Sequence, residues 1–267
     1  MNYEALLFPE NEQPLDKLVH DGGFVGIFRT IACVGDSLSS GEFERVDEQG
    51  VTHYHDLFDY SWGQYIARAA GCKVYNFSRG GMTAKWYMET YAEENGFWNP
   101  ELKAQAYILA LGVNDLFGLK QEVGSTADID RADYRNNKPT FIGYYAQVIQ
   151  RYKEIQPDAK FFLMTMPRSN EQDAPTHAAH QKALQQLTEF FDNCYLIDLY
   201  TYGPVYDAKF CARFNLHGHM NPCGYIFTAQ MVISYIDYII RHDMNAFRYA
   251  GLIGTGIVDC DRDNRPV

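Results

Sequence analysis

The chain has 267 residues, of which 46% are hydrophobic and 15% aromatic, and its formal net charge is −11. This length suits a single domain with a sizeable core, and the acidic balance argues against nucleic acid or an anionic membrane surface as partner. The scattered cysteines give poor support for a metal site or a disulfide framework. Residues 1–16 show no basic-then-apolar signal pattern and no apolar run approaches ~20 residues, so we expect a reduced, cytoplasmic protein.

Predicted strands and helices alternate along the chain after an accessory segment at residues 1–28. Within that segment, the apolar run 24–28 is expected as a short strand. Residues 38–60 form a polar and aromatic connection that includes Glu42 and Glu44, and connections of this length are often functional. We expect the main strands at about 29–34, 73–77, 104–111, 160–166 and 195–199, and helices at 62–70, 141–155, 176–192 and 222–241. Residues 84–104 are expected to be largely helical, with breaks near Asn95-Gly96 and Asn99-Pro100.

The alternation predicts one α/β domain with a doubly wound, five-stranded parallel sheet and helices on both faces. No internal repeat and no linker interrupts it, so residues 1–267 are expected to form a single domain. Its core spans about 30–240, and residues 242–267 form a C-terminal extension without an assigned structure. We prefer the strand order 2-1-3-4-5, although the sequence does not fix it.

Polar groups suited to acyl transfer follow three of the predicted strands. Ser37 follows the first strand, Gly81 the second and Asn114 the third, while His219 precedes the last helix. The carboxyl ends of parallel strands share one edge of the sheet, where ligands bind in such folds. A serine hydroxyl needs a base such as histidine, and a developing oxyanion needs fixed donors. The N–H groups of Ser37 and Gly81 and the side-chain amide of Asn114 are suitable donors.

The four residues lie in short motifs that read Gly35-Asp36-Ser37-Leu38, Asn76-Phe77-Ser78-Arg79-Gly80-Gly81-Met82-Thr83, Gly112-Val113-Asn114-Asp115 and His219-Met220-Asn221-Pro222-Cys223-Gly224-Tyr225. In order and spacing, these motifs resemble the sequence blocks of the GDSL-type, or SGNH, hydrolases. The resemblance implies a flavodoxin-like three-layer α/β/α sandwich. It also implies that Ser37 is the nucleophile and His219 the base, with Ser37, Gly81 and Asn114 forming the oxyanion hole.

Two of these assignments have rivals nearby. Gly80 competes with Gly81, because a slip of one residue exchanges them, and His217 competes with His219 as the base. Asp115 is expected to brace its loop rather than to take part in the chemistry.

One position departs from the family pattern. The family usually has an aspartate three residues before the histidine, and Leu216 stands there. That aspartate orients the imidazole and stabilises its charged form. Its role could pass to Asp198, to Asp207, to a backbone carbonyl or to no group at all. We favour a dyad of Ser37 and His219 with a backbone-oriented histidine.

The resemblance implies a serine esterase that works through an acyl-enzyme and needs no cofactor. The polar connections favour a hydrophilic small-molecule substrate, such as an O-acetylated carbohydrate. The alternatives are a lysophospholipase- or thioesterase-type lipolytic enzyme, a related acyltransferase, and a non-catalytic carbohydrate-binding relative. A dinucleotide-binding protein is disfavoured, because no Gly-x-Gly-x-x-Gly follows the first strand. The tyrosine-rich composition leaves a homo-oligomer open.

Overall fold

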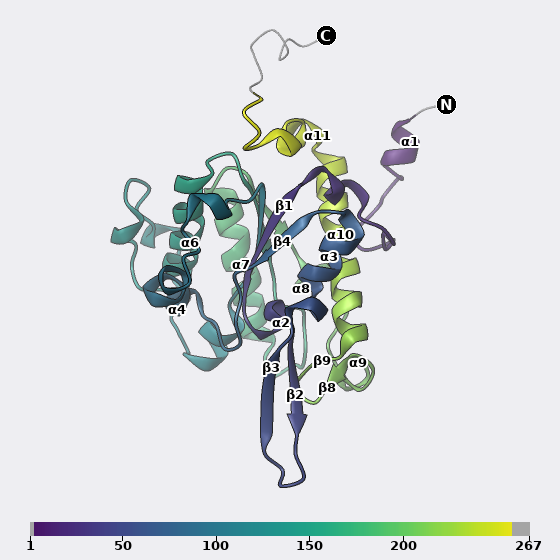
Figure 1. Cartoon of the computed structure of the whole chain (residues 1–267), viewed down its shortest axis with the longest axis vertical. Helices are drawn as coiled ribbons and strands as arrows, with labels where there is room; N and C mark the ends of the chain where they lie inside the picture. Colours follow the sequence, from purple (N-terminus) through teal and green to yellow (C-terminus); the bar gives the residue numbers. More distant parts are fainter. Residues whose placement is uncertain (1–2, 258–267) are drawn as a thin grey trace.

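The computed structural model describes residues 3–257 and contains a parallel five-stranded sheet between two layers of helices (Figure 1). The strand order is β4-β1-β5-β6-β7, which confirms the predicted order 2-1-3-4-5 of the main strands. Of the predicted extension at 242–267, residues 258–267 lie outside the described part of the chain. The strands are β1 (Thr30–Gly35), β4 (Lys73–Asn76), β5 (Ala106–Ala110), β6 (Lys160–Met164) and β7 (Cys194–Ile197).

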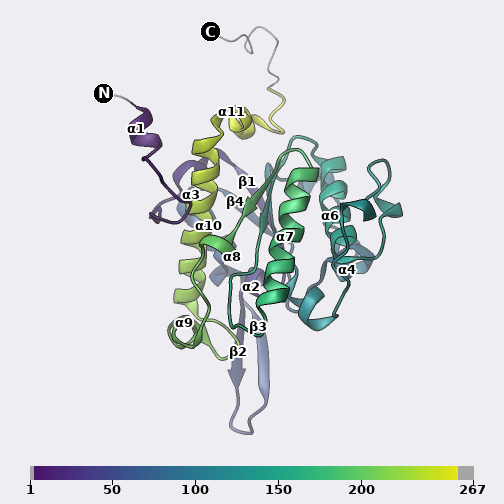
Figure 2. The ribbon, with the colours of Figure 1, turned by 180° about the vertical axis from the view of Figure 1, so that it is seen from behind.

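Both faces of the sheet are buried, which explains why its strands read as continuous apolar runs. In β1, Ile31 and Cys33 pack on one side, against α3 (Trp62–Ala70) and α10 (Pro222–His242). Ala32 and Val34 pack on the other side, where α6 (Phe141–Ile155) and α7 (Ala174–Phe190) cover the sheet. Figure 2 shows α7 and α10 from behind, on either side of the sheet.

The predicted helix ends are confirmed by their caps. The Ser61 hydroxyl accepts a hydrogen bond from the backbone N–H of Gln64 at the start of α3, and Gly71 ends this helix with a φ of 63°. Asn221 caps α10 by accepting from the Gly224 N–H, and Pro222 occupies the first turn.

Helix α10 is one residue longer than predicted and contains a long apolar window. This window of 18 residues has a mean hydropathy of 1.3, so by length and composition the helix passes the test for a membrane span. Two thirds of the apolar window is buried against the rest of the protein, as expected for a core helix. The expectation that no apolar run approaches such a length is therefore wrong.

The 38–60 connection is not an irregular loop. It contains an antiparallel hairpin, formed by β2 (Glu42–Val46) and β3 (Thr52–Asp56), which projects from one end of the molecule (Figure 1). Every residue of β3 is exposed, so the strand lacks the apolar alternation by which strands are recognised. In the register, Glu42 is opposite Asp56 and Glu44 is opposite Tyr54. These four side chains share one face, because alternate residues point to the same side.

One further expectation is corrected. Residues 24–28 lie in a 3₁₀ helix, η1 (Gly23–Ile27), and at its end rather than in a strand. The stretch 84–104 is largely helical and is interrupted at 95–99, as the sequence predicts, and buried aromatic side chains such as Tyr87 pack along it. The pieces are α4 (Ala84–Trp86), η3 (Tyr87–Tyr91), α5 (Ala92–Glu94) and η4 (Pro100–Leu102).

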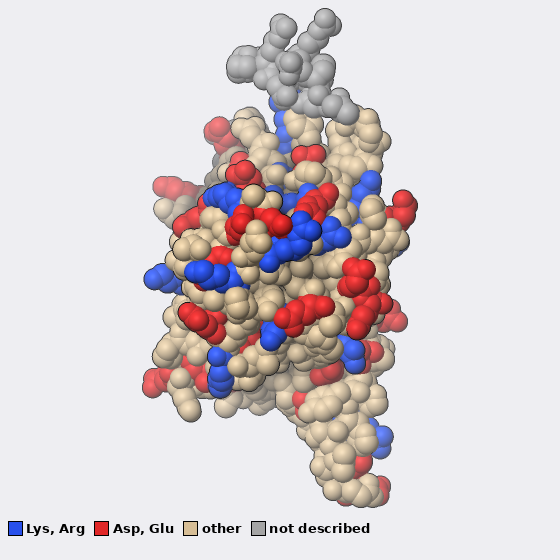
Figure 3. Space-filling view, turned by 90° about the vertical axis from the view of Figure 1, so that its left-hand side faces the viewer, with Lys and Arg blue, Asp and Glu red and all other residues tan. Residues whose placement is uncertain are grey.

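The remaining elements are short. They are α1 (Glu4–Leu7), α2 (Ser37–Ser40), η2 (Phe58–Tyr60), η5 (Asn114–Gly118), η6 (Thr126–Asp128), η7 (Tyr134–Asn136), α8 (Leu199–Tyr202), α9 (Ala208–Phe214), β8 (Asn215–Leu216), β9 (His219–Met220), α11 (Met244–Phe247) and η8 (Ala250–Leu252). On the face shown in Figure 3, basic and acidic side chains are intermingled over the body, and the projecting end is mainly uncharged.

Candidate active site

A pocket of about 530 Å³ brings the predicted site residues together at the carboxyl edge of the sheet. It contains all four residues predicted for catalysis, together with groups from the hairpin and from the loop after β4. The position agrees with the rule that ligands bind beyond the carboxyl ends of parallel strands. The residues that line it are Ser37, Glu42, Tyr54, Asp56, Arg79, Gly80, Gly81, Asn114 and His219.

Ser37 is held at a tight turn between β1 and α2. The Asp36 side chain caps this short helix by accepting a hydrogen bond from the Leu38 N–H at 3.1 Å. Gly41 ends the helix after a single turn, in the left-handed region with a φ of 77°. Asp36 is buried, and burial raises the pKa of its carboxyl to about 6. The turn leaves Ser37 partly exposed at the pocket, while Asp36, Ser39 and Ser40 are buried.

The two oxyanion candidates come from adjacent loops. Gly81 has a φ of +73°, a conformation that favours glycine, and a Cβ added there would meet nothing within 4 Å. The Asn114 side-chain amide donates to the Met82 carbonyl at 3.1 Å, which ties the loop after β5 to the loop after β4. Gly80 lines the same pocket, so its rivalry with Gly81 is left open.

Asp115 also joins the loop after β5 to the segment after β4. Its Oδ1 accepts a hydrogen bond from the Ala84 N–H at 2.8 Å, and the side chain is fully buried. Within residues 3–257, its Oδ2 atom has no hydrogen-bond partner. Burial raises the pKa of Asp115 to about 7, because the charged form loses its hydration. This arrangement agrees with the bracing role expected for Asp115.

The orienting group of His219 is Glu44, from the hairpin. His219 lies in β9, and its Nδ1 atom is 2.5 Å from Oε1 of Glu44. The other oxygen of Glu44 accepts from the Gly218 N–H at 3.0 Å, so the carboxylate is fixed at both ends. Burial alone would raise the pKa of Glu44, but the hydrogen bonds from Gly218 and His219 outweigh it and lower the pKa below its usual value.

The expectations for the third catalytic group are therefore wrong. Asp198 and Asp207 cap the helices α8 and α9, and neither lines the pocket. The other two expectations were a backbone carbonyl as partner of His219 and a histidine with no partner. The structure instead has the carboxylate of Glu44 at Nδ1. Leu216, at the position of the family's aspartate, is 45% exposed and pairs with His219 across a short ladder.

His217 is exposed in the turn between β8 and β9, with a φ of 58°, and it does not line the pocket. The pocket contains His219 instead, which supports the preferred register of the base. Glu44 could not be found from the sequence, because it lies in β2, a strand that the sequence pattern did not predict.

A second glutamate approaches the other ring nitrogen of His219. Oε1 of Glu42 lies 3.1 Å from Nε2, and the Glu42 side chain is largely buried. Burial raises the pKa of Glu42, nearby Asp56 and Glu44 add to this, and His219 opposes it. Within residues 3–257, the His219 ring contacts these two glutamates and makes no hydrogen bond to Ser37.

The hairpin is anchored to the site by a residue of the last motif. The buried hydroxyl of Tyr225 donates to the backbone carbonyl of Glu42 at 2.7 Å. Its ring also packs edge-on against Phe43, with 5.4 Å between ring centroids. Tyr225 in α10 thus fixes the base of the hairpin, from which the side chains of Glu42 and Glu44 reach His219.

A small apolar cavity lies beside the pocket. It has a volume of about 60 Å³. Three of the residues lining it are direct neighbours of site residues: Leu38 follows Ser37, Val113 precedes Asn114, and Met220 follows His219. Met164, Met166, Pro167 and Leu199 add further apolar surface.

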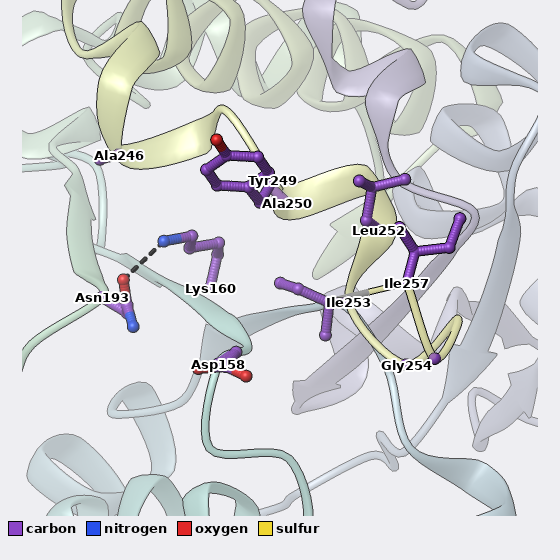
Figure 4. Close-up of a pocket in the computed structure, with 11 residues that line it drawn as sticks. Asp158, Lys160, Asn193, Ala246, Tyr249, Ala250, Leu252, Ile253, Gly254 and Ile257 are labelled. Atoms are coloured by element: carbon purple, nitrogen blue, oxygen red, sulfur yellow. Dashed lines mark hydrogen bonds between the residues drawn. The ribbon is translucent and has the colours of Figure 1, made fainter. Parts of the chain in front are cut away.

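Another cavity, of about 470 Å³, lies at the opposite edge of the sheet (Figure 4). Lys160 and Asn193 line it at the amino ends of β6 and β7, and their side chains are hydrogen-bonded at 2.5 Å. Among the residues that the structure describes, its lining contains no serine, cysteine or histidine.

Comparison with known proteins agrees with this geometry. The model of the GDSL-like Lipase/Acylhydrolase family matches residues 33–225. No curated protein matches the sequence. Among solved structures, the chain is similar to a family two carbohydrate esterase from Clostridium thermocellum, solved in complex with cellohexaose, with a TM-score of 0.56 at 14% identity. That alignment covers 82% of this chain and 65% of the esterase.

Two further structures are similar. The Clostridium thermocellum family 3 carbohydrate esterase aligns with a TM-score of 0.52 at 16% identity, over 80% of this chain and 97% of that one. A protein from Lactobacillus plantarum aligns with a TM-score of 0.57 at 16% identity, over 79% of this chain and 97% of that one. At identities this low, the structural alignments show a shared fold alone.

Proposed function

The chain belongs to the GDSL-like lipase/acylhydrolase family of ester-hydrolysing enzymes, and on this premise we propose that it hydrolyses a short-acyl ester of a hydrophilic, carbohydrate-like alcohol. The observation that carries the proposal is the joining of Ser37, His219, Gly81 and Asn114 in one pocket. Glu44 completes the set by its contact with Nδ1 of His219.

In the first half-reaction, Nε2 of His219 takes the proton of the Ser37 hydroxyl as its oxygen attacks the ester carbonyl. The carbonyl oxygen becomes an oxyanion, which the N–H groups of Ser37 and Gly81 and the Asn114 amide stabilise. The bond to the alcohol then breaks, and His219 returns the proton to the departing oxygen. Glu44 keeps Nδ1 protonated and stabilises the positive charge that the ring carries between these steps.

In the second half-reaction, water takes the place of the alcohol. His219 removes a proton from the water as its oxygen attacks the acyl-Ser37 carbonyl, and the same donors hold the second oxyanion. Collapse of this intermediate breaks the bond to Ser37, which recovers its proton from His219. The products are the free acid and the original enzyme.

The small cavity beside the pocket supports a short acyl group. At about 60 Å³, it exceeds the ~15 Å³ of probe volume that one water needs, yet it is far below the ~300 Å³ of a drug-sized pocket. Its apolar lining suits a methyl or ethyl group. A lysophospholipase- or thioesterase-type substrate calls for a longer apolar channel.

The main pocket supports a polar alcohol. Its lining includes the carboxylates of Glu42 and Asp56, the Arg79 guanidinium and the exposed ring of Tyr54. Sugar hydroxyls match such acceptors and donors, and aromatic rings pack against the apolar face of a sugar. Several proteins of similar structure are carbohydrate esterases, which supports the same class of alcohol.

Hydrolysis of p-nitrophenyl acetate, butyrate and octanoate by the wild type and by Ser37→Ala, His219→Ala and His217→Ala tests the proposal. We expect the acetate to react fastest, and the first two variants to lose ~10³-fold or more in kcat. His217→Ala should keep the wild-type rate. Equal rates for the wild type and Ser37→Ala on every ester would refute catalysis by Ser37, whereas a preference for octanoate would point to the lipolytic alternative.

A further inference from the structure

We infer that Glu42 is a specificity-determining residue, which accepts a hydrogen bond from a free hydroxyl next to the scissile ester. When Glu42 binds this hydroxyl, it gives up its contact with Nε2 of His219, and Nε2 is then free to accept the proton of Ser37. The inference rests on the proposed function and deepens it, because Glu42 would select esters whose alcohol carries a hydrogen-bond donor.

The carboxylate of Glu42 lies between the base and the loop that carries the oxyanion donors. One oxygen is 3.1 Å from Nε2 of His219. The other lies over Gly80, where an added Cβ would come within 2.0 Å of it. Nε2 is the atom that returns a proton to the leaving alcohol, so the alcohol portion of a substrate must come close to this carboxylate.

The contact between Glu42 and Nε2 opposes the role of His219 as a base. A general base presents a lone pair on the nitrogen that faces the hydroxyl. A carboxylate 3.1 Å from that nitrogen favours a proton there, because the ion pair is stronger than a contact with the neutral ring. Turnover therefore requires the Glu42 carboxylate to exchange this contact for another donor.

A neutral hydroxyl is the donor that suits the surroundings. The side chain of Glu42 is only 11% exposed, and it shares its hairpin face with Glu44 and Asp56, so acceptors outnumber donors there. A buried carboxylate that loses one partner is strongly destabilised unless another donor replaces it. Arg79 lines the same pocket and balances part of this negative charge, so that the neutral hydroxyl groups of a sugar are matching donors.

The test compares two esters that carry the same acetyl group. One is an acetylated methyl glucoside with free neighbouring hydroxyls, and in the other those hydroxyls are methyl ethers. We expect the wild type to prefer the first substrate in kcat/KM. Glu42→Ala should lower this preference by about tenfold to a hundredfold, the range for one hydrogen bond to a charged group.

The same variant should increase its rate on p-nitrophenyl acetate, which has no hydroxyl donor, because Nε2 is released. Glu42→Gln keeps the size of the side chain and loses its charge, so it should lower the preference less than Glu42→Ala. It carries the test if circular dichroism shows that Glu42→Ala is unfolded. Glu48→Gln, at an exposed position of the same hairpin, should leave both rates and the preference unchanged.

Three results would overturn the inference: no preference in the wild type, an unchanged preference in Glu42→Ala and Glu42→Gln, or an equal loss on both glucosides. In each case, a rate that still disappears in Ser37→Ala leaves the serine-esterase function intact. A wild type no faster than Ser37→Ala on any ester would instead remove the proposed function itself.

Discussion

The carboxylate of Glu44 lies 2.5 Å from Nδ1 of His219, although the two residues are 175 positions apart in the sequence. The sheet and helix α10 bring them together, because the β2–β3 hairpin leaves the sheet near Ser37 and α10 follows His219. The hairpin thus supplies the carboxylate that the family usually has three residues before the histidine. This contact and three other features of the site, at Asn114, Tyr225 and Asp115, lead to predictions that can be measured.

Replacing Glu44 by Gln should lower kcat by ~10²-fold or more and leave KM nearly unchanged. The amide still accepts a hydrogen bond from Nδ1, but it does not stabilise the charged ring. Adding Leu216→Asp to this variant places a carboxylate at the family's usual position and should restore part of kcat. Glu48→Gln is the control. An unchanged kcat in Glu44→Gln would show that the contact has no catalytic role.

Removing the Asn114 amide should slow the chemical step. Loss of one oxyanion donor costs about 10²- to 10³-fold in kcat with little change in KM, and we expect Asn114→Ala to fall in this range. Asn136→Ala removes an exposed amide far along the chain and serves as control. A rise in KM with kcat preserved would mean that Asn114 binds substrate without stabilising the oxyanion.

Tyr225→Phe should loosen the base of the hairpin. The lost hydrogen bond leaves the backbone carbonyl of Glu42 without its donor, which should lower the free energy of unfolding by about 1–3 kcal/mol. Both glutamates that contact His219 then shift, so kcat should fall as well. Thermal unfolding and steady-state kinetics measure the two effects, and Tyr3→Phe, on an exposed ring that does not line the pocket, is the control. A loss of stability without any loss of kcat would separate the anchor from the site.

Asp115 should make the protein less stable as the pH rises. Its carboxyl has the ordinary aspartate pKa of 3.8 when the chain is unfolded, and burial raises the pKa to about 7 in the folded protein. Between these values the folded state retains a proton that the unfolded state releases. The stability contribution is thus complete below pH 3.8 and is lost as the pH approaches 7.

Asp115→Asn removes this titration. Relative to the variant, the free energy of unfolding of the wild type should fall by up to ~1.4 kcal/mol per pH unit over that window. Urea unfolding of both proteins between pH 4 and pH 8 measures the difference. Parallel curves would show that Asp115 does not titrate in this range.

The parallel sheet could be predicted because its strands are apolar runs with strong end signals. Helix α6 was expected at 141–155 and α3 at 62–70, and both occur with those bounds, since Thr140 and Ser61 cap them. Ser37, Gly81, Asn114 and His219 could be placed in one pocket because short motifs mark the ends of β1, β4 and β5 and the start of α10.

The hairpin could not be predicted, because its residues carry no pattern of burial. Five consecutive residues of β3 are exposed, and β2 becomes exposed after Glu44. Its pairing is fixed instead by its base, where the Tyr225 hydroxyl holds Glu42 and the Phe43 ring packs on Tyr225. Those contacts join residues 183 positions apart, and no local rule of periodicity reports them. The roles of Glu42 and Glu44 were missed for this reason.

The most direct test of the account is the reactivity of Ser37 itself. A serine-directed fluorophosphonate reacts only with an activated hydroxyl, and peptide mass spectrometry identifies the modified residue. We predict a single adduct on Ser37 that forms rapidly in the wild type, at least ~10²-fold more slowly in Glu44→Gln, and not in Ser37→Ala. Absence of labelling in the folded wild type, or an adduct on another serine that persists in Ser37→Ala, would contradict the account.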